Sequence, residues 1–240
     1  MPKILLIAHK GITSEGDRGN TLVDFKKAAE AGVDMIEMDI RRTKDNVFIA
    51  HYEEDISNVF LKNVTFSNAQ EIAEKRGYKI PRLEDIIREL PDMRFDFELK
   101  EEGYETELVE FLHAYLPDKT RYIISSFNDR SITLIKNKDP EIKAGLRLYE
   151  KNPKNFIETR ISEVFPFKRI EECNADFVAF NYKLLPAGLA WRSEKRGLDV
   201  YFWGLETQPN LNPFLKNRAL KGIITDRFFE VQEILKDLNE

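Results

Sequence analysis

Short runs of β-branched and aromatic residues alternate with amphipathic stretches along this 240-residue chain, and this alternation constrains the fold more than any other feature. Most of the runs are apolar without strict polar alternation, which is typical of parallel strands covered on their outer face. The predicted strands are Lys3–His9, Asp34–Ile40, Met93–Lys100, Arg121–Ser126, Lys143–Leu148, Asp176–Asn181, Asp199–Gly204 and Lys221–Thr225. The predicted helices are Thr21–Ala31, Leu83–Leu90, Glu105–Tyr115, Arg130–Lys136, Phe156–Phe165, Leu184–Arg196, Pro213–Leu220 and Glu230–Leu238. Strands alternating with helices in this number predict a (β/α)₈ barrel, the TIM-barrel fold.

The rival architecture is a doubly wound open sheet, which usually carries a Gly-rich phosphate turn after its first strand. Here the first predicted strand ends at His9 and is followed by Lys10 and Gly11, so no Gly-rich turn of this kind is present. The sequence therefore favours the barrel.

One interval breaks the regular alternation. Between Ile40 and Leu83 the sequence contains a short strand-like piece, Val47–His51, and then a stretch of weak periodicity. We interpret residues 52–80 as a small insertion after strand two, over the mouth of the barrel, where active sites of this fold lie. No linker is visible, so residues 1–240 are predicted to form a single domain.

Composition excludes several classes of protein. The single cysteine, Cys173, cannot form an internal disulfide, which argues against a disulfide-stapled secreted scaffold and against a zinc ribbon. With 37 Lys and Arg against 42 Asp and Glu, the net charge of -5 gives no reason to expect a nucleic-acid partner. The longest early apolar run, Ile4–Ala8, is too short for a signal peptide or a membrane span. We expect a soluble cytoplasmic protein without stable membrane insertion, and the oligomeric state stays open, a homo-oligomer included.

Acidic side chains gather on the inner faces of the second and third predicted strands. Alternate residues of a strand face the same side. In the second strand, Glu37 and Asp39 therefore lie on the face opposite to the apolar one. In the third strand, the same holds for Asp96, Glu98 and Lys100. Buried carboxylates need compensation. Two kinds are available: salt bridges, or a hard divalent cation. Because one inward lysine leaves negative charge in excess, the sequence favours a metal site over a purely structural network.

Two of the three histidines follow strands that lead to this mouth. His9 ends the first strand and His51 ends the strand-like piece after the second. Two histidines beside a metal suggest a general base and a general acid working near neutral pH. His113 lies within a predicted helix and is expected to be structural or exposed. Trp203 ends the seventh strand, where an aromatic ring can form the wall of a ligand slot.

Motifs in order along nearly the whole chain carry a family resemblance. They are His9-Lys10-Gly11, Asn20-Thr21-Leu22, Glu37-Met38-Asp39-Ile40, Thr43-Lys44-Asp45, His51, Pro81-Arg82-Leu83-Glu84, Phe97-Glu98-Leu99-Lys100, Ser126-Phe127, Trp203 and Gly222-Ile223-Ile224-Thr225-Asp226. This series resembles the glycerophosphodiester phosphodiesterases, whose amino-terminal pattern is His-Arg-Gly, Glu-Asn-Thr, Glu-(apolar)-Asp, Thr-Lys-Asp and His-Asp. The family fold is a TIM barrel with a small insertion after strand two, which agrees with the independent strand pattern.

The resemblance implies an enzyme with a divalent metal. The reaction would be hydrolysis of a glycerophosphodiester to sn-glycerol 3-phosphate and an alcohol. At the matched positions, Glu37, Asp39 and Glu98 would bind Mg²⁺ or Ca²⁺, with Mn²⁺ as a third option.

The resemblance also implies roles for the other matched residues. His9 and His51 would be the catalytic pair: one removes the proton of the glycerol 2-hydroxyl, which attacks phosphorus, and the other protonates the leaving alkoxide. Lys10 and Lys100 would bind substrate at the phosphate, and Trp203 would lie against the glycerol.

The sequence departs from the family pattern at three positions. Lys10 replaces the Arg, which keeps the charge but loses the bidentate fork; Gly19 replaces the Glu before Asn-Thr; and Tyr52 replaces the Asp after the second His. Candidate replacements in the same loop are Arg18 for the fork and Glu15 or Asp17 for the lost acid.

Two other functions are compatible with these residues. One is a phospholipase D-like enzyme that acts on lysophospholipids and releases cyclic phosphates. The other is a catalytically degenerate barrel that binds a phosphate ligand without turning it over. The intact set of acids and histidines favours a catalytic function over ligand binding alone.

Overall fold

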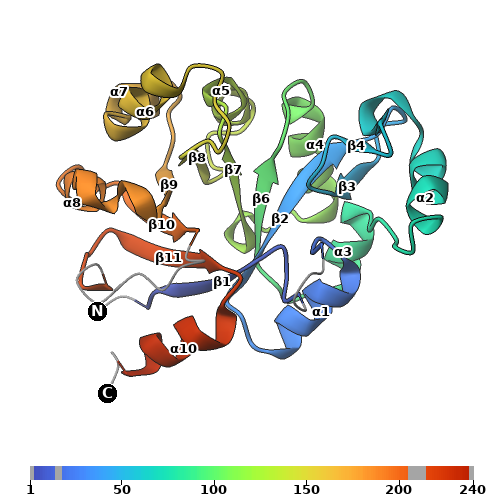
Figure 1. The fold of residues 1–240 in the computed structure, drawn as a ribbon, viewed down its shortest axis with the longest axis horizontal. Coiled ribbons are helices and arrows are strands. Elements are labelled where there is room, and N and C mark those ends of the chain that lie inside the picture. The colour runs from blue at the N-terminus through green and yellow to red at the C-terminus, as the bar shows by residue number, and fades with distance from the viewer. Residues whose placement is uncertain (1–2, 14–17, 205–214, 238–240) are drawn as a thin grey trace.

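The predicted barrel is confirmed by the structure, a computed structural model that describes residues 3–13, 18–204 and 215–237. In this part of the chain eight parallel strands close on themselves through the pairing of β1 with β2, and helices surround them (Figure 1). The barrel strands, in chain order, are β1 (Leu5–His9), β2 (Met35–Arg42), β6 (Phe95–Leu99), β7 (Tyr122–Ser126), β8 (Ala144–Leu148), β9 (Phe177–Asn181), β10 (Asp199–Trp203) and β11 (Leu220–Thr225).

The α-helices follow the strands much as the periodicity predicts. They are α1 (Leu22–Glu30), α2 (Phe66–Glu74), α3 (Leu83–Glu89), α4 (Glu105–Tyr115), α5 (Asp129–Lys138), α6 (Phe156–Val164), α7 (Phe167–Glu172), α8 (Leu189–Glu194) and α10 (Phe228–Asp237). Shorter elements are the strands β3 (Phe48–Ala50), β4 (Asp55–Ile56) and β5 (Val59–Phe60) and the 3₁₀ helices η1 (Leu61–Asn63), η2 (Lys119–Arg121) and η3 (Tyr182–Ala187). Local chemistry fixes the ends: the Thr21 hydroxyl, for example, caps α1 by accepting from the Asp24 backbone N–H at 3.2 Å.

Alternation along the strands sorts the apolar residues into two layers. One set packs between strands and helices, as Leu6 and Ala8 of β1 do. The other set packs inside the barrel: Ile7, Met35, Ile123, Phe177, Ala179, Tyr201 and Ile224. This inner layer fills the barrel interior, so polar residues at the carboxyl ends of the strands lie directly above an apolar core.

Two predicted helices need correction, and one further helix was not predicted. The structure divides Leu184–Arg196 into η3 and α8, because Pro186 lies inside the first piece and Gly188 takes a left-handed φ of 68° between them. After α6 the chain passes through Pro166 into a further helix, α7, that was not predicted. The helix predicted over Pro213–Leu220 lies partly outside the described residues, and Leu220 belongs to β11.

The segment between β2 and α3 has more structure than its weak periodicity indicates. β3 pairs antiparallel with β2, and β4, β5, η1 and α2 follow it. They enclose a small apolar cluster of their own: Ile49, Ile56, Leu61, Ala69, Ala73 and Ile80. Helix α2 was missed because its buried face consists of two alanines, Ala69 and Ala73, which give little hydrophobic signal. No helix in the described ranges is long and apolar enough to cross a membrane.

Candidate active site

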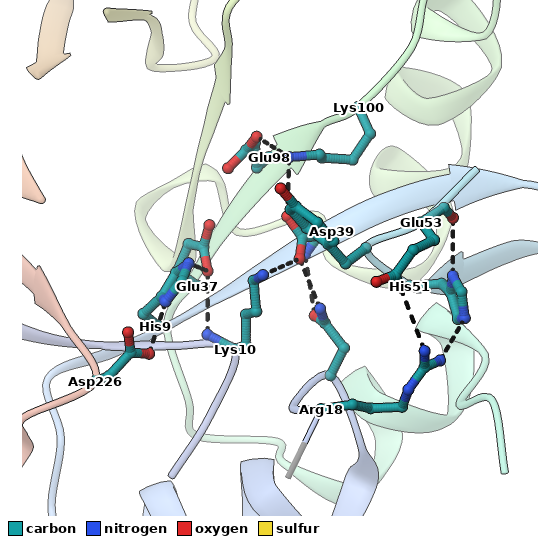
Figure 2. A network of polar contacts seen from close by, with 12 residues as sticks. His9, Lys10, Arg18, Glu37, Asp39, His51, Glu53, Glu98, Lys100 and Asp226 are labelled. Atoms are coloured by element: carbon teal, nitrogen blue, oxygen red, sulfur yellow. Dashed lines mark hydrogen bonds and ion pairs between the residues drawn. The ribbon is translucent and has the colours of Figure 1, made fainter. Parts of the chain in front are cut away.

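Three carboxylates meet at the mouth of the barrel, as the alternation predicts. Glu37 and Asp39 extend from β2 and Glu98 from β6, where Asp39 and Glu98 are partners in the strand register. All three are buried, and one oxygen from each lies within 4.8 Å of the others. Figure 2 shows them with the polar groups around them.

Three cations compensate these acids, and not the one lysine expected. Lys100 Nζ lies 2.5 Å from Glu98 Oε1 and 3.3 Å from Asp39 Oδ1, while Lys10 Nζ lies 3.5 Å from Asp39 Oδ2. Arg147 Nη1 lies 2.9 Å from Glu37 Oε1 and also pairs with Glu98 Oε2. The expectation of a single compensating lysine is therefore wrong, since Lys10 and Arg147 add two positive charges to that of Lys100.

Arg147 was missed although its signal was present. It is the fourth residue of β8, on the same face as Gly145, two residues earlier. The strand reads as apolar overall, and the alternation that located Glu37 and Glu98 was not carried through it. Applied there, it would have placed an arginine inside the barrel beside the acids.

The donor set fits a hard divalent cation. Carboxylate oxygens are the ligands that Mg²⁺ and Ca²⁺ take in proteins. Burial would raise the pKa of Asp39, but Lys100 and Lys10 outweigh it and lower this pKa to about 2, so the carboxylate is ionised. Asp39 Oδ1 is buried, and apart from the ion pair with Lys100 it accepts no hydrogen bond from a described residue, so it has room for a further partner. Asn20 holds the other oxygen by donating to Oδ2 at 2.6 Å.

His9 faces the carboxylates and is oriented by an acid from the last strand. Its Nδ1 lies 2.7 Å from Asp226 Oδ1, and its Nε2 lies 4.0 Å from Glu37 Oε2. Burial would lower the pKa of His9, but the charges of Glu37 and Asp226 outweigh it and raise this pKa. Asp226 stands at the end of the Gly-Ile-Ile-Thr-Asp motif that the sequence singled out, but its contact with His9 was not foreseen.

His51 lies on the opposite side of Asp39 from His9 (Figure 2), and its surroundings differ. Its Nδ1 lies 2.8 Å from the Glu53 carbonyl oxygen, and its Nε2 lies 2.9 Å from Arg18 Nη1. Because a guanidinium only donates, Nε2 accepts, and Nδ1 donates to the carbonyl; only the neutral imidazole satisfies both bonds. Burial and the positive charge of Arg18 lower the pKa of His51.

One cavity of about 270 Å³ opens above the carboxylates. It is lined by His9, Lys10, Asp39, Tyr52, Glu98, Lys100, Phe127, Arg147, Glu150, Lys151, Asn152, Trp203, Gly204, Ile224, Thr225 and Asp226. His51 does not line it: His51 and Arg18 border a smaller pocket, and Tyr52 lines both spaces. The structure therefore gathers His9, Lys10, Lys100 and Trp203 on one cavity, while His51 borders the neighbouring pocket.

The remaining candidates are placed as follows. Trp203 packs edge-on to Phe127 with ring centroids 5.9 Å apart, and its indole N–H has no hydrogen-bond partner in the described chain. Tyr201 belongs to the inner apolar layer. His113 pairs with Asp139 at 2.7 Å on α4 and is 43% exposed, so it plays no part at the mouth. Cys173 is buried without a disulfide partner.

The loop after β1 gives a mixed outcome. Arg18 borders the smaller pocket and not the cavity that Lys10 lines, and it stacks over Tyr78 at 4.3 Å and bonds His51. Glu15 and Asp17, the two suggested replacements for the lost acid, lie outside the described residues.

Comparison with known proteins places this arrangement in a family. The profile of the glycerophosphoryl diester phosphodiesterase family matches residues 9–229. A glycerophosphodiester phosphodiesterase of Caldanaerobacter subterraneus subsp. tengcongensis is 28% identical over 93% of this chain and 94% of its own.

Solved structures share the fold. A glycerophosphodiester phosphodiesterase from Parabacteroides distasonis is 22% identical, covers 99% of this chain and 98% of its own, and has a TM-score of 0.79. An Oleispira antarctica phosphodiesterase in complex with the product sn-glycerol-3-phosphate is 21% identical, covers 97% and 96%, and has a TM-score of 0.76.

Proposed function

The chain belongs to the glycerophosphoryl diester phosphodiesterase family, and we propose that it is a metal-dependent enzyme that hydrolyses small glycerophosphodiesters to sn-glycerol 3-phosphate and an alcohol. The observation that carries this proposal is a buried acidic triad, two members of which, Asp39 and Glu98, line one cavity together with a histidine oriented by Asp226 and two lysines. Such a combination can hold a cation and a phosphate together beside a proton-transfer group.

Glu37, Asp39 and Glu98 would hold the divalent cation, for which Mg²⁺ and Ca²⁺ are the first candidates and Mn²⁺ the next. When bound, such a cation stabilises negative charge that develops on phosphoryl oxygens. Lys10 and Lys100 would neutralise the same oxygens from the protein side, since their ammonium groups already stand at the rim of the triad.

His9 and His51 would exchange the protons of the reaction. His9, held beside two carboxylates, is suited to carry the proton that the leaving alkoxide needs. His51 is neutral, with a lone pair on Nε2 that can accept the proton of the glycerol 2-hydroxyl. For that step His51 must exchange its bond with Arg18 for one with substrate. The attack would expel the alcohol and leave a glycerol cyclic phosphate, and a water molecule would then open this ring to sn-glycerol 3-phosphate, with the two histidines exchanging their roles as acid and base.

Trp203 would position the glycerol moiety. Its ring lines the cavity, and Phe127 supports it from the side. An aromatic wall opposite charged groups binds the carbon skeleton of a small polar substrate while leaving its hydroxyls to the polar side.

The test is a substrate panel. Purified protein is assayed with glycerophosphocholine, glycerophosphoethanolamine and glycerophosphoglycerol, with Mg²⁺, Ca²⁺ or Mn²⁺ and with EDTA, and sn-glycerol 3-phosphate is measured. Release with metal but not with EDTA supports the proposal. No release from any substrate with any metal contradicts it, and ligand-induced stabilisation without turnover would identify a binding protein instead.

A second candidate is the phospholipase D-like activity on lysophospholipids, and one observation favours it. The loop that lines the cavity at Glu150–Asn152 leads within a few residues into α6, where Ile157, Ile161 and Phe165 are 71%, 58% and 66% exposed and line a groove. An acyl chain could lie along such an apolar groove. Phosphorus NMR of the product separates a cyclic phosphate from an open monoester, and therefore the two activities.

A further inference from the structure

The acidic triad has a resident cation of its own, the guanidinium of Arg147. Its side chain is only 4% exposed, and Nη1 contacts Glu37 and Glu98, two of the three acids that would hold a metal. Its Nε and Nη2 make no hydrogen bond to any described residue. The guanidinium is therefore held by two carboxylates that a divalent cation would also need, and no neutral group among the described residues is hydrogen-bonded to it.

The structure also offers Arg147 another partner. Asp96 lies beside Glu37 in the strand register, and its Oδ2 is buried 3.7 Å from Arg147 Nη2 without a hydrogen bond in the described residues. Ser125 donates to the other oxygen of Asp96 at 2.8 Å and holds that carboxyl in place. A modest movement of the guanidinium would exchange Glu37 and Glu98 for Asp96.

We propose that Arg147 competes with the divalent cation for Glu37 and Glu98 and so sets the metal affinity of this enzyme. In the metal-free protein the guanidinium bridges the two carboxylates; on loading it withdraws toward Asp96 and stays nearby as a positive charge. This inference rests on the metal site of the proposed function. It predicts that the native site binds divalent cations with lower affinity than the same three acids would without the arginine. The reason is that the metal must displace the guanidinium and is then repelled by its positive charge nearby.

The experiment measures metal binding directly, without substrate. Isothermal titration with Mg²⁺, Ca²⁺ and Mn²⁺ is carried out on the native protein, Arg147→Met and Arg147→Lys. Met keeps much of the length of the side chain but removes its charge, so the metal affinity of Arg147→Met should be higher than that of the native protein by on the order of tenfold or more. Lys keeps the charge but not the forked donors, so the metal affinity of Arg147→Lys should lie between those of the native protein and Arg147→Met. Arg169→Met is the matched control: Arg169 binds Asp129 through two hydrogen bonds between α7 and α5, and its loss should leave metal affinity unchanged.

Loss of Arg147 leaves the buried acids short of a counter-ion, so Arg147→Met should melt at a lower temperature without metal and gain more from saturating metal than the native protein does. If that variant does not fold, ¹⁵N NMR of the arginine side chains in the native protein gives a second test. The Arg147 guanidinium signals, assigned by their absence from the Lys variant, should move on metal titration while those of Arg169 do not.

Equal or weaker affinity in Arg147→Met would overturn the inference, and so would unmoved Arg147 signals at saturating metal. Absence of metal binding in both proteins would overturn it too, since the triad would then not be a cation site. A failure of the proposed function is recognised separately: the affinities would differ as expected while no substrate of the panel released sn-glycerol 3-phosphate.

Discussion

The contact between His9 and Asp226 supplies a test of the proposed proton transfer. His9 Nδ1 and Asp226 Oδ1 are 2.7 Å apart, and a hydrogen bond with a charged partner contributes about 1.5–3 kcal/mol against about 0.5–1.5 for a neutral one. Asp226→Asn removes the charge but keeps the shape, so it should cost about 1–1.5 kcal/mol of transition-state stabilisation. This corresponds to a roughly five- to twelvefold lower kcat. Asp226→Ala removes the whole bond and should cost up to about 3 kcal/mol, roughly 150-fold.

The pH dependence of kcat tests the direction in which Asp226 shifts the pKa of His9. The pKa of His9 is raised by Glu37 and Asp226 against the burial that would lower it, so loss of the Asp226 charge must lower that pKa. If His9 delivers a proton to the leaving group, activity is lost as pH rises through the His9 pKa. The alkaline limb of the kcat profile in Asp226→Asn should therefore move to lower pH, whereas the acidic limb should stay.

The assay follows release of sn-glycerol 3-phosphate from glycerophosphocholine between about pH 5 and 9 in both variants. Asp199→Asn is a suitable control, because Asp199 begins β10 at the other end of the barrel, where it pairs with Lys143 and Lys221. An unchanged kcat and an unchanged alkaline limb in Asp226→Asn would refute the orienting role of Asp226. Movement of the acidic limb instead would reverse the assignment of the two histidines.

Three further predictions follow from particular contacts. Removal of divalent cations with EDTA should abolish turnover, and readdition of Mg²⁺ or Ca²⁺ should restore it; full activity after chelation would contradict a metal mechanism. Tyr52→Leu removes the ring that lies 3.6 Å from Lys10 Nζ, so KM should rise roughly two- to thirtyfold, for a cation–π contact of about 0.5–2 kcal/mol, in steady-state assays. Gly145→Ala would place a Cβ 2.2 Å from the ring of Phe177 inside the barrel, and this overpacking should lower the free energy of unfolding by about 1–3 kcal/mol in urea titrations.

The sequence predicted what depends on local periodicity. The alternation of Glu37 and Asp39 with apolar neighbours placed both acids inside the barrel, and the structure agrees because the register sets β2 beside β6. The parts it missed depend on contacts between distant segments. Nothing near Asp226 in the sequence indicates His9, which lies 217 residues away. Likewise, the division at Gly188 reflects a left-handed turn that an amphipathic pattern does not register.

The three departures from the family pattern form one spatial unit, which no reading of separate positions could show. A Cβ on Gly19 would lie 2.7 Å from Lys10 Cβ, and Gly19 has a left-handed φ of 67°, so a glutamate at this position would require a different path of the loop.

Lys10 in turn places its ammonium over the ring of Tyr52, which also lies 4.7 Å from Lys100 Nζ. Tyr52 also lines both the cavity and the smaller pocket that His51 borders. Restoring the family residue at Gly19 or at Tyr52 would disturb Lys10, because Lys10 packs against both positions. Lys10 and Tyr52 line the cavity, and Gly19 constrains the path of Lys10. We therefore expect differences in substrate choice from relatives to arise around Lys10 and Tyr52, while the acidic triad and His9 keep the arrangement that the proposed chemistry needs.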